Sequence, residues 1–207
     1  DALILELKDV AGNELFQMVL EKTVLQMTKL LKDDLSDFRV RQDGFYSEKS
    51  LFSEGRIKEA CEIIKKNGNA YKKDGALWLE STKYGDDKDR VVIREDGRST
   101  YFASDIAYHH HKKVRGFDLL INVLGSDHHG YVSRLEAGLA STGNKVSDLE
   151  VILMQFVTLY RGKKKIQMST RSGNFVPMRD LYSEVGVDAA RFFYVSRSHG
   201  QHLDFDL

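Results

Sequence analysis

The sequence predicts an α/β protein with a parallel sheet and helices on both faces of that sheet. Apolar runs at residues 117–124 and 149–160 are typical of strands that are covered on both faces of a parallel sheet. Segments with helical character lie between and after these runs, at residues 131–141 and 188–196. This alternation of strand and helix is typical of an open sheet with right-handed crossover connections.

The composition indicates one ordinary globular domain, or one domain with an insertion. The 207 residues are 42% hydrophobic and 30% charged. Lysine plus arginine equals aspartate plus glutamate at 31 each, so the net basic charge of a purely RNA-binding protein is absent. The single cysteine, Cys61, excludes an internal disulfide framework and a cysteine-based zinc site. No apolar run approaches the ~20 residues of a membrane span, so we expect no membrane partner.

The N-terminal region predicts a long amphipathic helix over residues 13–35. Its apolar side chains recur at spacings of three and four, which places them on one face. We expect this stripe to pack in the core. The residues of the stripe are Phe16, Leu20, Val24, Met27, Leu31 and Leu35.

The region between this helix and the first apolar run is less regular. A second helix is expected from about residue 54 to residue 66, closed by Gly68. Residues 71–100 are polar and rich in loop-forming types. Within them, residues 91–93 and 99–102 are expected to pair as a hairpin around a turn at Glu95-Asp96-Gly97. A helix over residues 105–113 follows.

Polar residues gather directly after the apolar run that ends at Leu124. Gly125 allows a ligand to approach the backbone closely, and Asp127 can accept hydrogen bonds from ribose hydroxyls. His128 and His129 add donors, acceptors or metal ligands. Ligands of open α/β sheets bind beyond the carboxyl ends of strands, so this segment is a candidate site. The alternative is a polar turn that caps the following helix.

A second candidate pairs Tyr101 with Asp105. These residues are four apart and share a face if a helix begins near Phe102. A carboxylate beside a phenol ring suits a planar guanidinium, which binds the carboxylate in a bidentate manner and stacks on the ring. The alternative is that Asp105 only complements the helix dipole. The run His109-His110-His111 is interpreted as mostly surface.

The third candidate is the segment from Arg161 to Phe175. It combines three consecutive lysines with a run of hydroxyl side chains, Arg171 and Gly173, which together suit a polyphosphate. The alternative is a solvated basic turn. No Walker sequence occurs anywhere in the chain, which argues against a P-loop nucleoside triphosphatase.

Taken together, these segments resemble arginyl-tRNA synthetase, a class I aminoacyl-tRNA synthetase. The matching blocks are GALWLESTKYGDDKDRVVI at 75–93, TYFASDIAYHHHKKVRGFDLLINVLGSDHHGY at 100–131, QMSTRSGNFV at 167–176 and GVDAARFFYVSRS at 186–198. The resemblance implies part of a Rossmann-like nucleotide-binding fold. Residues 45–100 would be a connective-peptide-like insertion, and residues 161–198 the KMSKS-like loop with the helix after it.

The resemblance also implies roles for individual residues. Tyr101, Asp105 and His128 match positions that bind the substrate arginine, and Asp105 would pair with its guanidinium. Gly125 and Asp127 match the stretch around the ribose of ATP. The KMSKS loop, which stabilises the triphosphate, is matched by Met168, Ser169, Thr170 and Arg171. Of these, Met168 and Ser169 are expected to bind ATP, and Thr170 and Arg171 to act in catalysis.

Two departures from the family pattern bear on activity. Gln167 and Thr170 stand where the KMSKS motif has lysines, so Arg171 or a lysine of 163–165 would supply the missing charge. No HIGH motif occurs in the chain, and the anticodon-binding domain expected after Leu207 is also missing. We therefore expect a partial class I catalytic domain, residues 1–207, that is inactive on its own.

The resemblance implies a parent enzyme that joins L-arginine to its cognate tRNA through an arginyl-adenylate in the cytoplasm. ATP would be the nucleotide, accompanied by Mg²⁺ with no protein ligand assigned. Two other readings stay open. The Asp127-His128-His129 run also suits a Mn²⁺-dependent phosphoesterase, and the missing HIGH motif also suits a non-catalytic arginine- or RNA-binding module.

Overall fold

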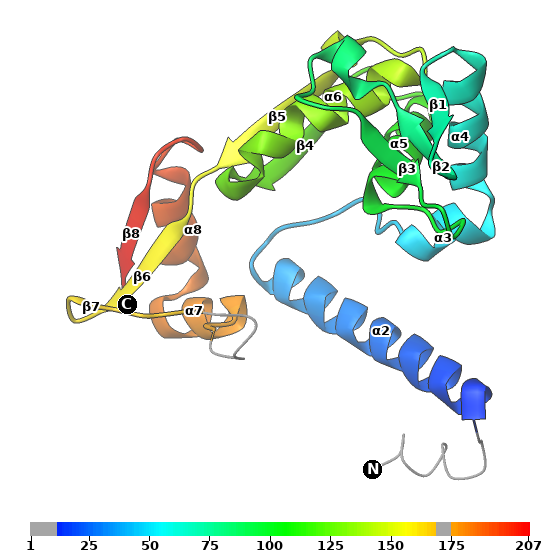
Figure 1. Cartoon of the computed structure of the whole chain (residues 1–207). Coiled ribbons are helices and arrows are strands. Elements are labelled where there is room, and N and C mark those ends of the chain that lie inside the picture. Colours follow the sequence, from blue (N-terminus) through cyan, green and yellow to red (C-terminus); the bar gives the residue numbers. More distant parts are fainter. Residues whose placement is uncertain (1–11, 169–174) are drawn as a thin grey trace. The chain divides into compact units, whose positions relative to one another are not determined.

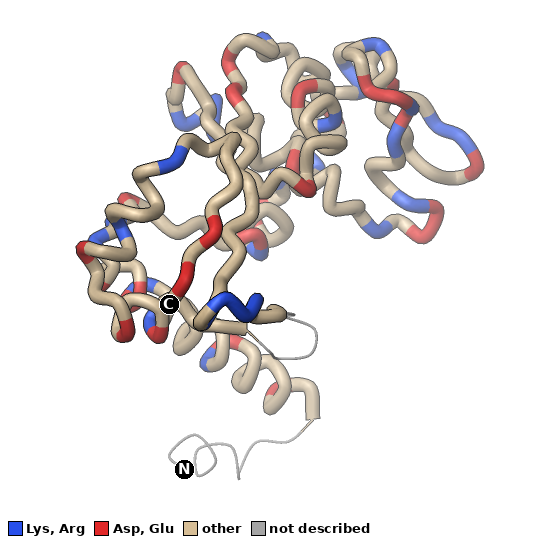
Figure 2. The backbone as a smooth tube through the Cα atoms, turned by 90° about the vertical axis from the view of Figure 1, so that its left-hand side faces the viewer, with Lys and Arg blue, Asp and Glu red and all other residues tan. Residues whose placement is uncertain are grey.

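The computed structural model describes residues 12–168 and 175–207, which form two compact units (Figure 1). We call residues 44–157 and 198–203 the central unit. The terminal unit comprises the described residues up to 43, those from 158 to 197, and residues 204–207. Positions occupied by Lys and Arg are interspersed with those of Asp and Glu along the backbone (Figure 2), in keeping with the zero net charge.

Over its described residues, the terminal unit combines three helices with a small sheet. Its helices are α2 (Gly12–Asp37), α7 (Met178–Val185) and α8 (Val187–Val195). The sheet has the strand order β7-β6-β8, formed by Lys164–Lys165, Val157–Arg161 and Leu203–Asp206. The predicted helices at residues 13–35 and 188–196 are therefore confirmed as α2 and α8.

The predicted core packing of α2 is wrong. None of its residues is buried, and the side chains of Phe16, Val24 and Met27 are each more than half exposed. Near its C-terminal end α2 makes polar contacts with α7, as where Arg179 donates to Asp34 at 3.0 Å. Helical periodicity shows which side chains share a face, but it does not show that a neighbour covers that face.

The central unit contains most of the regular structure. Its helices are α3 (Glu48–Ser53), α4 (Arg56–Lys66), α5 (Tyr101–Val114) and α6 (Val132–Ser141), with 3₁₀ turns η1 (Ser81–Tyr84), η2 (Ser126–Tyr131) and η3 (Val146–Asp148). Its strands are β1 (Ala70–Lys73), β2 (Ala76–Leu79), β3 (Arg90–Ile93), β4 (Leu120–Gly125) and β5 (Leu149–Met154).

Strands β4 and β5 confirm the predicted parallel sheet. They pair in parallel from Leu120 opposite Leu149 to Gly125 opposite Met154. The second apolar run does not form one strand, because β5 ends at Met154 and the backbone N–H of Gln155 donates to His199 at 2.8 Å. The connection between β4 and β5 contains α6, as the α/β prediction requires.

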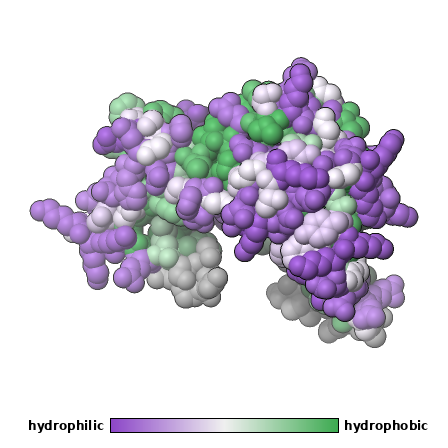
Figure 3. Space-filling model, turned by 45° about the horizontal axis from the view of Figure 1, so that its top comes forward, coloured by the Kyte–Doolittle hydropathy of each residue, from purple (hydrophilic) through white to green (hydrophobic). Residues whose placement is uncertain are grey.

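Within the described residues, helices cover one face of this strand pair. Leu120 and Leu149 are buried against Leu135 and Leu139 of α6. The next residues of β4 point the other way, and Ile121 and Val123 are 53% and 62% exposed. Apolar side chains also reach the surface in Figure 3. Among the described helices, none combines the length and the apolar character needed to cross a membrane.

An antiparallel sheet of β1, β2 and β3 replaces much of the loop predicted over residues 71–100. Each strand has only four residues, and β1 ends in two lysines, so the sequence carries little strand pattern. The predicted hairpin is right only as far as Ser99, which bridges Ile93. Beyond Ser99 it is wrong, because Thr100 caps α5 by accepting a hydrogen bond from the backbone N–H of Ala103.

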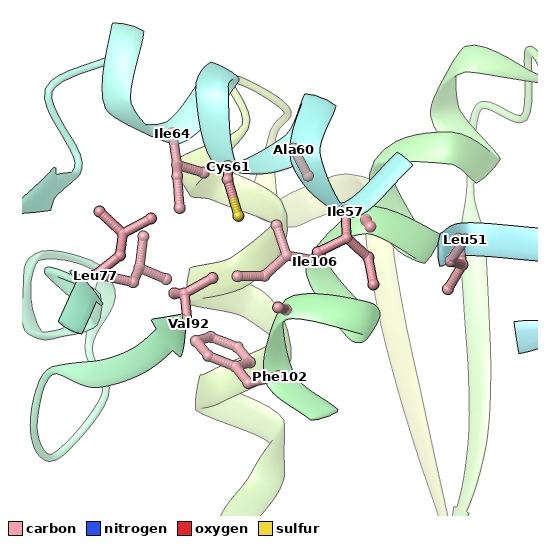
Figure 4. Packing of buried hydrophobic residues seen from close by; sticks show 12 residues of the cluster. Leu51, Ile57, Ala60, Cys61, Ile64, Leu77, Val92, Phe102 and Ile106 are labelled. Carbon is pink, nitrogen blue, oxygen red and sulfur yellow. The ribbon is translucent and has the colours of Figure 1, made fainter. Parts of the chain in front are cut away.

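The main core of the central unit lies between α4, α5 and this sheet. Figure 4 shows Cys61 of α4 directed toward the side chains of Val92 and Ile106. Burial raises the pKa of the Cys61 thiol to about 11, so the thiol is neutral and behaves as a small apolar side chain. Residues 45–100 therefore fold together with α5 in one unit.

Helices α5 and α6 approach closely at Gly138. A Cβ atom at this position would lie 3.0 Å from Cγ1 of Ile106 and 3.3 Å from the ring of Phe102. Only a residue without a side chain therefore fits between the two helices without displacing a neighbour.

The loop before β3 is fixed by a buried ion pair. Arg90 donates to both carboxylate oxygens of Asp86 at 2.8 Å, and the Asp86 side chain is 1% exposed. These hydrogen bonds hold the pKa of Asp86 well below its usual range. Since η1 packs against α6, the ion pair also fixes the segment that supports that helix.

We expect Gly138→Val to lower the free energy of unfolding by about 1–3 kcal/mol, because the added methyl groups overpack the contact with Ile106 and Phe102. Urea unfolding followed by circular dichroism measures this change. The control is Gly44→Val, where a Cβ atom would meet nothing within 4 Å. Equal effects of the two substitutions would contradict the close approach of the helices.

We expect Asp86→Asn to cost about 3 kcal/mol near neutral pH, because it leaves Arg90 with a broken buried pair. The carboxylate has a depressed pKa, so its stabilisation is present above about pH 4 and is lost as the pH falls below that value. The difference between wild type and variant in urea unfolding should therefore shrink in acid. Asp87→Asn is the control, since Asp87 contacts the same arginine but its side chain is 73% exposed. A constant difference from pH 7 to pH 3 would contradict the assignment.

Candidate functional site

A cavity of about 640 Å³ lies inside the central unit. Helices α3 and α5, strand β4 and the turn η2 contribute its walls. A cavity of this size is typical of small-molecule sites. Its polar lining residues are Tyr46, Glu48, Tyr101, Ser104, Asp105, Tyr108, His109, Asn122, His128 and Tyr131.

The structure brings Tyr101, Asp105 and His128 together around this cavity. Tyr101 is the first residue of α5 and is 82% exposed, so its ring stands at the rim. Asp105 lies one helical turn further along the same face and is partly buried. His128 enters from η2, with its side chain 56% exposed. The two candidate sites that the sequence indicates separately, one with Tyr101 and Asp105 and the other with His128, therefore line one cavity.

The carboxylate of Asp105 is held by a neutral donor. The hydroxyl of Tyr131 donates to Oδ2 of Asp105 at 2.5 Å, whereas Oδ1 accepts no hydrogen bond from the described residues. Burial raises the pKa of Asp105, and the hydrogen bond from Tyr131 opposes that rise. Burial and the neighbouring carboxylate also raise the pKa of Tyr131. Tyr131 therefore stays a protonated donor at neutral pH.

His109 is buried, so its interpretation as a surface residue is wrong. Its Nδ1 lies 2.8 Å from the backbone carbonyl of Asp105 and its Nε2 lies 2.7 Å from the amide nitrogen of Asn122. The carbonyl can only accept and the amide nitrogen can only donate, so the ring is the neutral tautomer with its proton on Nδ1. Burial lowers the pKa of His109, which agrees with this assignment.

Glu48 and the aromatic pair beside it are site residues that the sequence does not predict. Glu48 of α3 lines the cavity and has no hydrogen-bond or ion-pair partner among the described residues. The rings of Tyr46 and Tyr108 stack at 4.7 Å. Tyr108 and His109 follow Asp105 by three and four residues, so the helical spacing that relates Tyr101 to Asp105 also predicts them on the same face. No comparable signal marks Glu48, which comes from a separate segment.

The cavity is suited to a cationic ligand. Glu48 and Asp105 supply carboxylates, and aromatic rings supply faces on which a planar cation can stack. Lys112 lies beside this cavity, since its Nζ lies 3.4 Å from Oδ1 of Asn122 and 4.3 Å from the ring centre of Tyr108. Burial raises the pKa of Asp105 and the charge of Lys112 opposes that rise, but no lysine or arginine of the described residues forms an ion pair with the Asp105 carboxylate.

Gly125 and Asp127 lie together at the carboxyl end of β4 but do not line the cavity. A Cβ atom at position 125 would lie 2.5 Å from Oδ1 of Asp127, so any other residue there would displace the Asp127 carboxylate from this position. Oδ2 of the same carboxylate lies 3.7 Å from Nε2 of His128. The two predicted ATP residues are thus next to the cavity through His128.

The basic segment after β6 is described only in part. Lys163 has a φ of +68° in the turn between β6 and β7, and Lys164 and Lys165 form β7. Met168 is 45% exposed. The predicted residues Ser169, Thr170 and Arg171 lie outside the described residues. Among those that are described, no three His, Cys, Asp or Glu side chains gather to form a metal site.

The amino-acid sequence of this chain is similar to those of known proteins of one family. A family model described as tRNA synthetases class I (R), catalytic domain, matches residues 4–195. Two curated relatives named arginine–tRNA ligase, from Thioalkalivibrio sulfidiphilus and Legionella pneumophila, are 51% and 48% identical over the whole chain. The chain spans 35% of the length of each of these relatives.

Solved structures show the same similarity. A putative arginyl-tRNA synthetase from Campylobacter jejuni has a TM-score of 0.88 and 37% identity, and the match covers 96% of this chain and 43% of that one. The arginyl-tRNA synthetase of Thermus thermophilus has a TM-score of 0.70 at 15% identity, covering 93% of this chain and 42% of that one, which supports the fold alone. The similarity therefore extends from the sequence blocks to the α/β fold, and the chain belongs to the family of class I tRNA synthetase (R) catalytic domains.

Proposed function

We propose that the protein, at its natural length, attaches L-arginine to its cognate tRNA through an arginyl-adenylate made from ATP. The observation that carries the proposal is the meeting of Tyr101, Asp105 and His128 around one cavity. These are the residues whose motifs match the arginine-binding positions of the family. Family membership supplies the reaction class, and the cavity supplies a place for the amino acid.

In this proposal the guanidinium of arginine binds the free Oδ1 of Asp105 and the carboxylate of Glu48. A carboxylate presents acceptors in the plane that a guanidinium needs, and charge-assisted hydrogen bonds of this kind are the stronger ones. Tyr101 offers its ring at the rim as a stacking surface, and His128 lies beside it. The cavity thereby selects a planar, always-charged cation rather than a compact ammonium.

ATP is the second substrate in this proposal. Gly125 and Asp127 would hold the ribose, and Met168, Ser169, Thr170 and Arg171 the triphosphate, with Arg171 or a lysine of 163–165 supplying the charge that the degenerate loop lacks. Mg²⁺ would accompany ATP, with no protein ligand assigned.

The reaction has two steps. The arginine carboxylate attacks the α-phosphorus and pyrophosphate leaves. A ribose hydroxyl of the tRNA then attacks the adenylate carbonyl and AMP leaves. Catalysis is by positioning and charge stabilisation.

The domain assignment is part of the same proposal. Residues 45–100, which contain α3, α4 and the β1-β2-β3 sheet, would be the connective-peptide insertion. Residues 161–198 would be the KMSKS-like loop and the helix after it. The site of amino-acid recognition would then be built from α5, β4 and η2, with Glu48 contributed by the insertion.

We expect Asp105→Asn in the natural-length protein to weaken L-arginine binding about 100-fold, because it removes one carboxylate from a charge pair in a partly buried site. Calorimetric titration with L-arginine, and with L-lysine as the competing cation, measures the effect. Asp96→Asn is the control, since Asp96 lies outside the cavity and pairs with Arg98 on the surface. Arginine-dependent exchange of pyrophosphate into ATP should fall with binding.

Each alternative function gives a different result in these assays. A Mn²⁺-dependent phosphoesterase would hydrolyse phosphate esters with Mn²⁺ and ignore arginine. A non-catalytic module would bind arginine without exchanging pyrophosphate. Absence of arginine binding by the natural-length protein would contradict the proposal.

We further expect the 207-residue chain to form no arginyl-adenylate alone, because its sequence contains no HIGH motif to stabilise the transition state. The check is pyrophosphate exchange with purified 207-residue chain beside the natural-length protein at equal concentration. Comparable exchange in the two samples would overturn this expectation.

A further inference from the structure

We infer that Tyr131 is a positioning residue for arginine selection: its hydroxyl fixes the Asp105 carboxylate and leaves Oδ1 for the guanidinium. The inference rests on the proposed function, since it concerns the same cavity. It adds a residue that contributes to selectivity through Asp105 rather than by direct contact with the ligand.

The first step in the argument is that a carboxylate turns easily about its terminal bond. The torsion that sets the plane of an aspartate carboxylate is broad, so the group needs a partner to hold one orientation. In the described residues that partner is the hydroxyl of Tyr131, which donates to Oδ2 at 2.5 Å. With Oδ2 engaged, the direction of Oδ1 is set before the ligand arrives.

The second step is that Tyr131 is itself held in place. Its ring packs against the apolar cluster of Leu120, Leu135, Leu139 and Leu149. The guanidinium of Arg134 lies 4.9 Å from the ring centre. Tyr131 also ends η2, directly before α6 begins at Val132. The donor is therefore attached to the core of the β4–β5 sheet and cannot follow a turning carboxylate.

The third step concerns charge. A lysine or arginine beside Asp105 would orient the carboxylate but would also neutralise it, and a ligand cation would have to compete. Tyr131 is a neutral donor, so it orients the carboxylate without forming an ion pair with it. The buried His109 bonds to the backbone of Asp105 rather than to its side chain. The site thus combines a fixed orientation with a carboxylate that has no ion-pair partner among the described residues.

The consequence is a preference for a planar cation over a compact ammonium. An ammonium donates in any direction and tolerates a turning carboxylate. A guanidinium donates within one plane, so it gains more from a carboxylate whose plane is fixed. Loss of the Tyr131 hydroxyl should therefore reduce arginine binding more than lysine binding.

The test is Tyr131→Phe in the natural-length protein, which keeps the ring and removes the hydroxyl. We expect KM for L-arginine in pyrophosphate exchange to rise roughly tenfold, because the carboxylate loses a hydrogen bond to its charged form. KM for ATP should stay unchanged. Discrimination between arginine and lysine, measured by calorimetric titration, should fall.

A pH profile distinguishes positioning from a general loss of structure. The charged or titratable groups that face Asp105 are Tyr131, His109, Glu48 and Lys112. Removing the Tyr131 hydrogen bond raises the pKa of Asp105, so the acid limb of kcat/KM for arginine should move to higher pH. Difluorotyrosine at position 131 is a stronger donor and should move the limb to lower pH. This variant keeps the test valid if the phenylalanine variant is unstable.

The matched control is Tyr71→Phe. Tyr71 donates to Oδ2 of Asp89 at 3.0 Å, so the control removes a similar tyrosine–aspartate hydrogen bond outside the cavity. It should leave KM for arginine and the pH profile unchanged.

The outcomes separate the two proposals. If the wild-type protein shows no arginine-dependent exchange, the proposed function fails. If wild type responds to arginine but Tyr131→Phe leaves KM, discrimination and the acid limb unchanged, the inference about Tyr131 is overturned and the proposed function stands. A rise in KM for ATP equal to that for arginine would also overturn it.

Discussion

The position of helix α5 determines both the core and the cavity of the central unit. One of its faces buries Phe102, Ala103, Ile106 and Ala107, while another presents Tyr101 and Asp105 to the cavity. Because the missing side chain at Gly138 lets α6 lie directly against α5, the helix cannot shift without disturbing both packing surfaces. The recognition residues are therefore placed by the same contacts that stabilise the unit, which is the arrangement that a precise polar site requires.

The cavity also contains a partly buried carboxylate that forms no ion pair with a lysine or arginine of the described residues. Burial raises the pKa of Asp105, and the hydrogen bond from the Tyr131 hydroxyl opposes that rise. His109 bonds to the backbone carbonyl of Asp105, while Lys112 lies against Asn122 and Tyr108. A ligand cation would therefore supply the ion-pair partner of this carboxylate, so that ligand binding and charge balance occur together.

Much of this architecture could be predicted from the sequence. The features that could not be predicted all depend on tertiary contacts. The apolar runs predict parallel strands because burial selects β-branched and leucine residues, and the spacing of Tyr101 and Asp105 predicts a shared helical face. Periodicity does not report what covers a helix face. The apolar stripe of α2 therefore predicts core packing, whereas none of the residues of α2 is buried. Glu48 and Tyr131 reach the cavity through tertiary packing, which no local pattern encodes.

The fixed tautomer of His109 makes the hydrogen bonds of this ring insensitive to moderate changes in pH. Proton uptake at Nε2 would set two donors against each other, the ring and the amide of Asn122. The buried imidazole therefore resists the titration that exposed histidines undergo near neutrality, and its pKa lies below the ordinary value. A modest acidification of the medium thus leaves the hydrogen-bond directions of the His109 ring unchanged. His109 therefore serves as a structural link between α5 and β4 and does not act as a pH sensor.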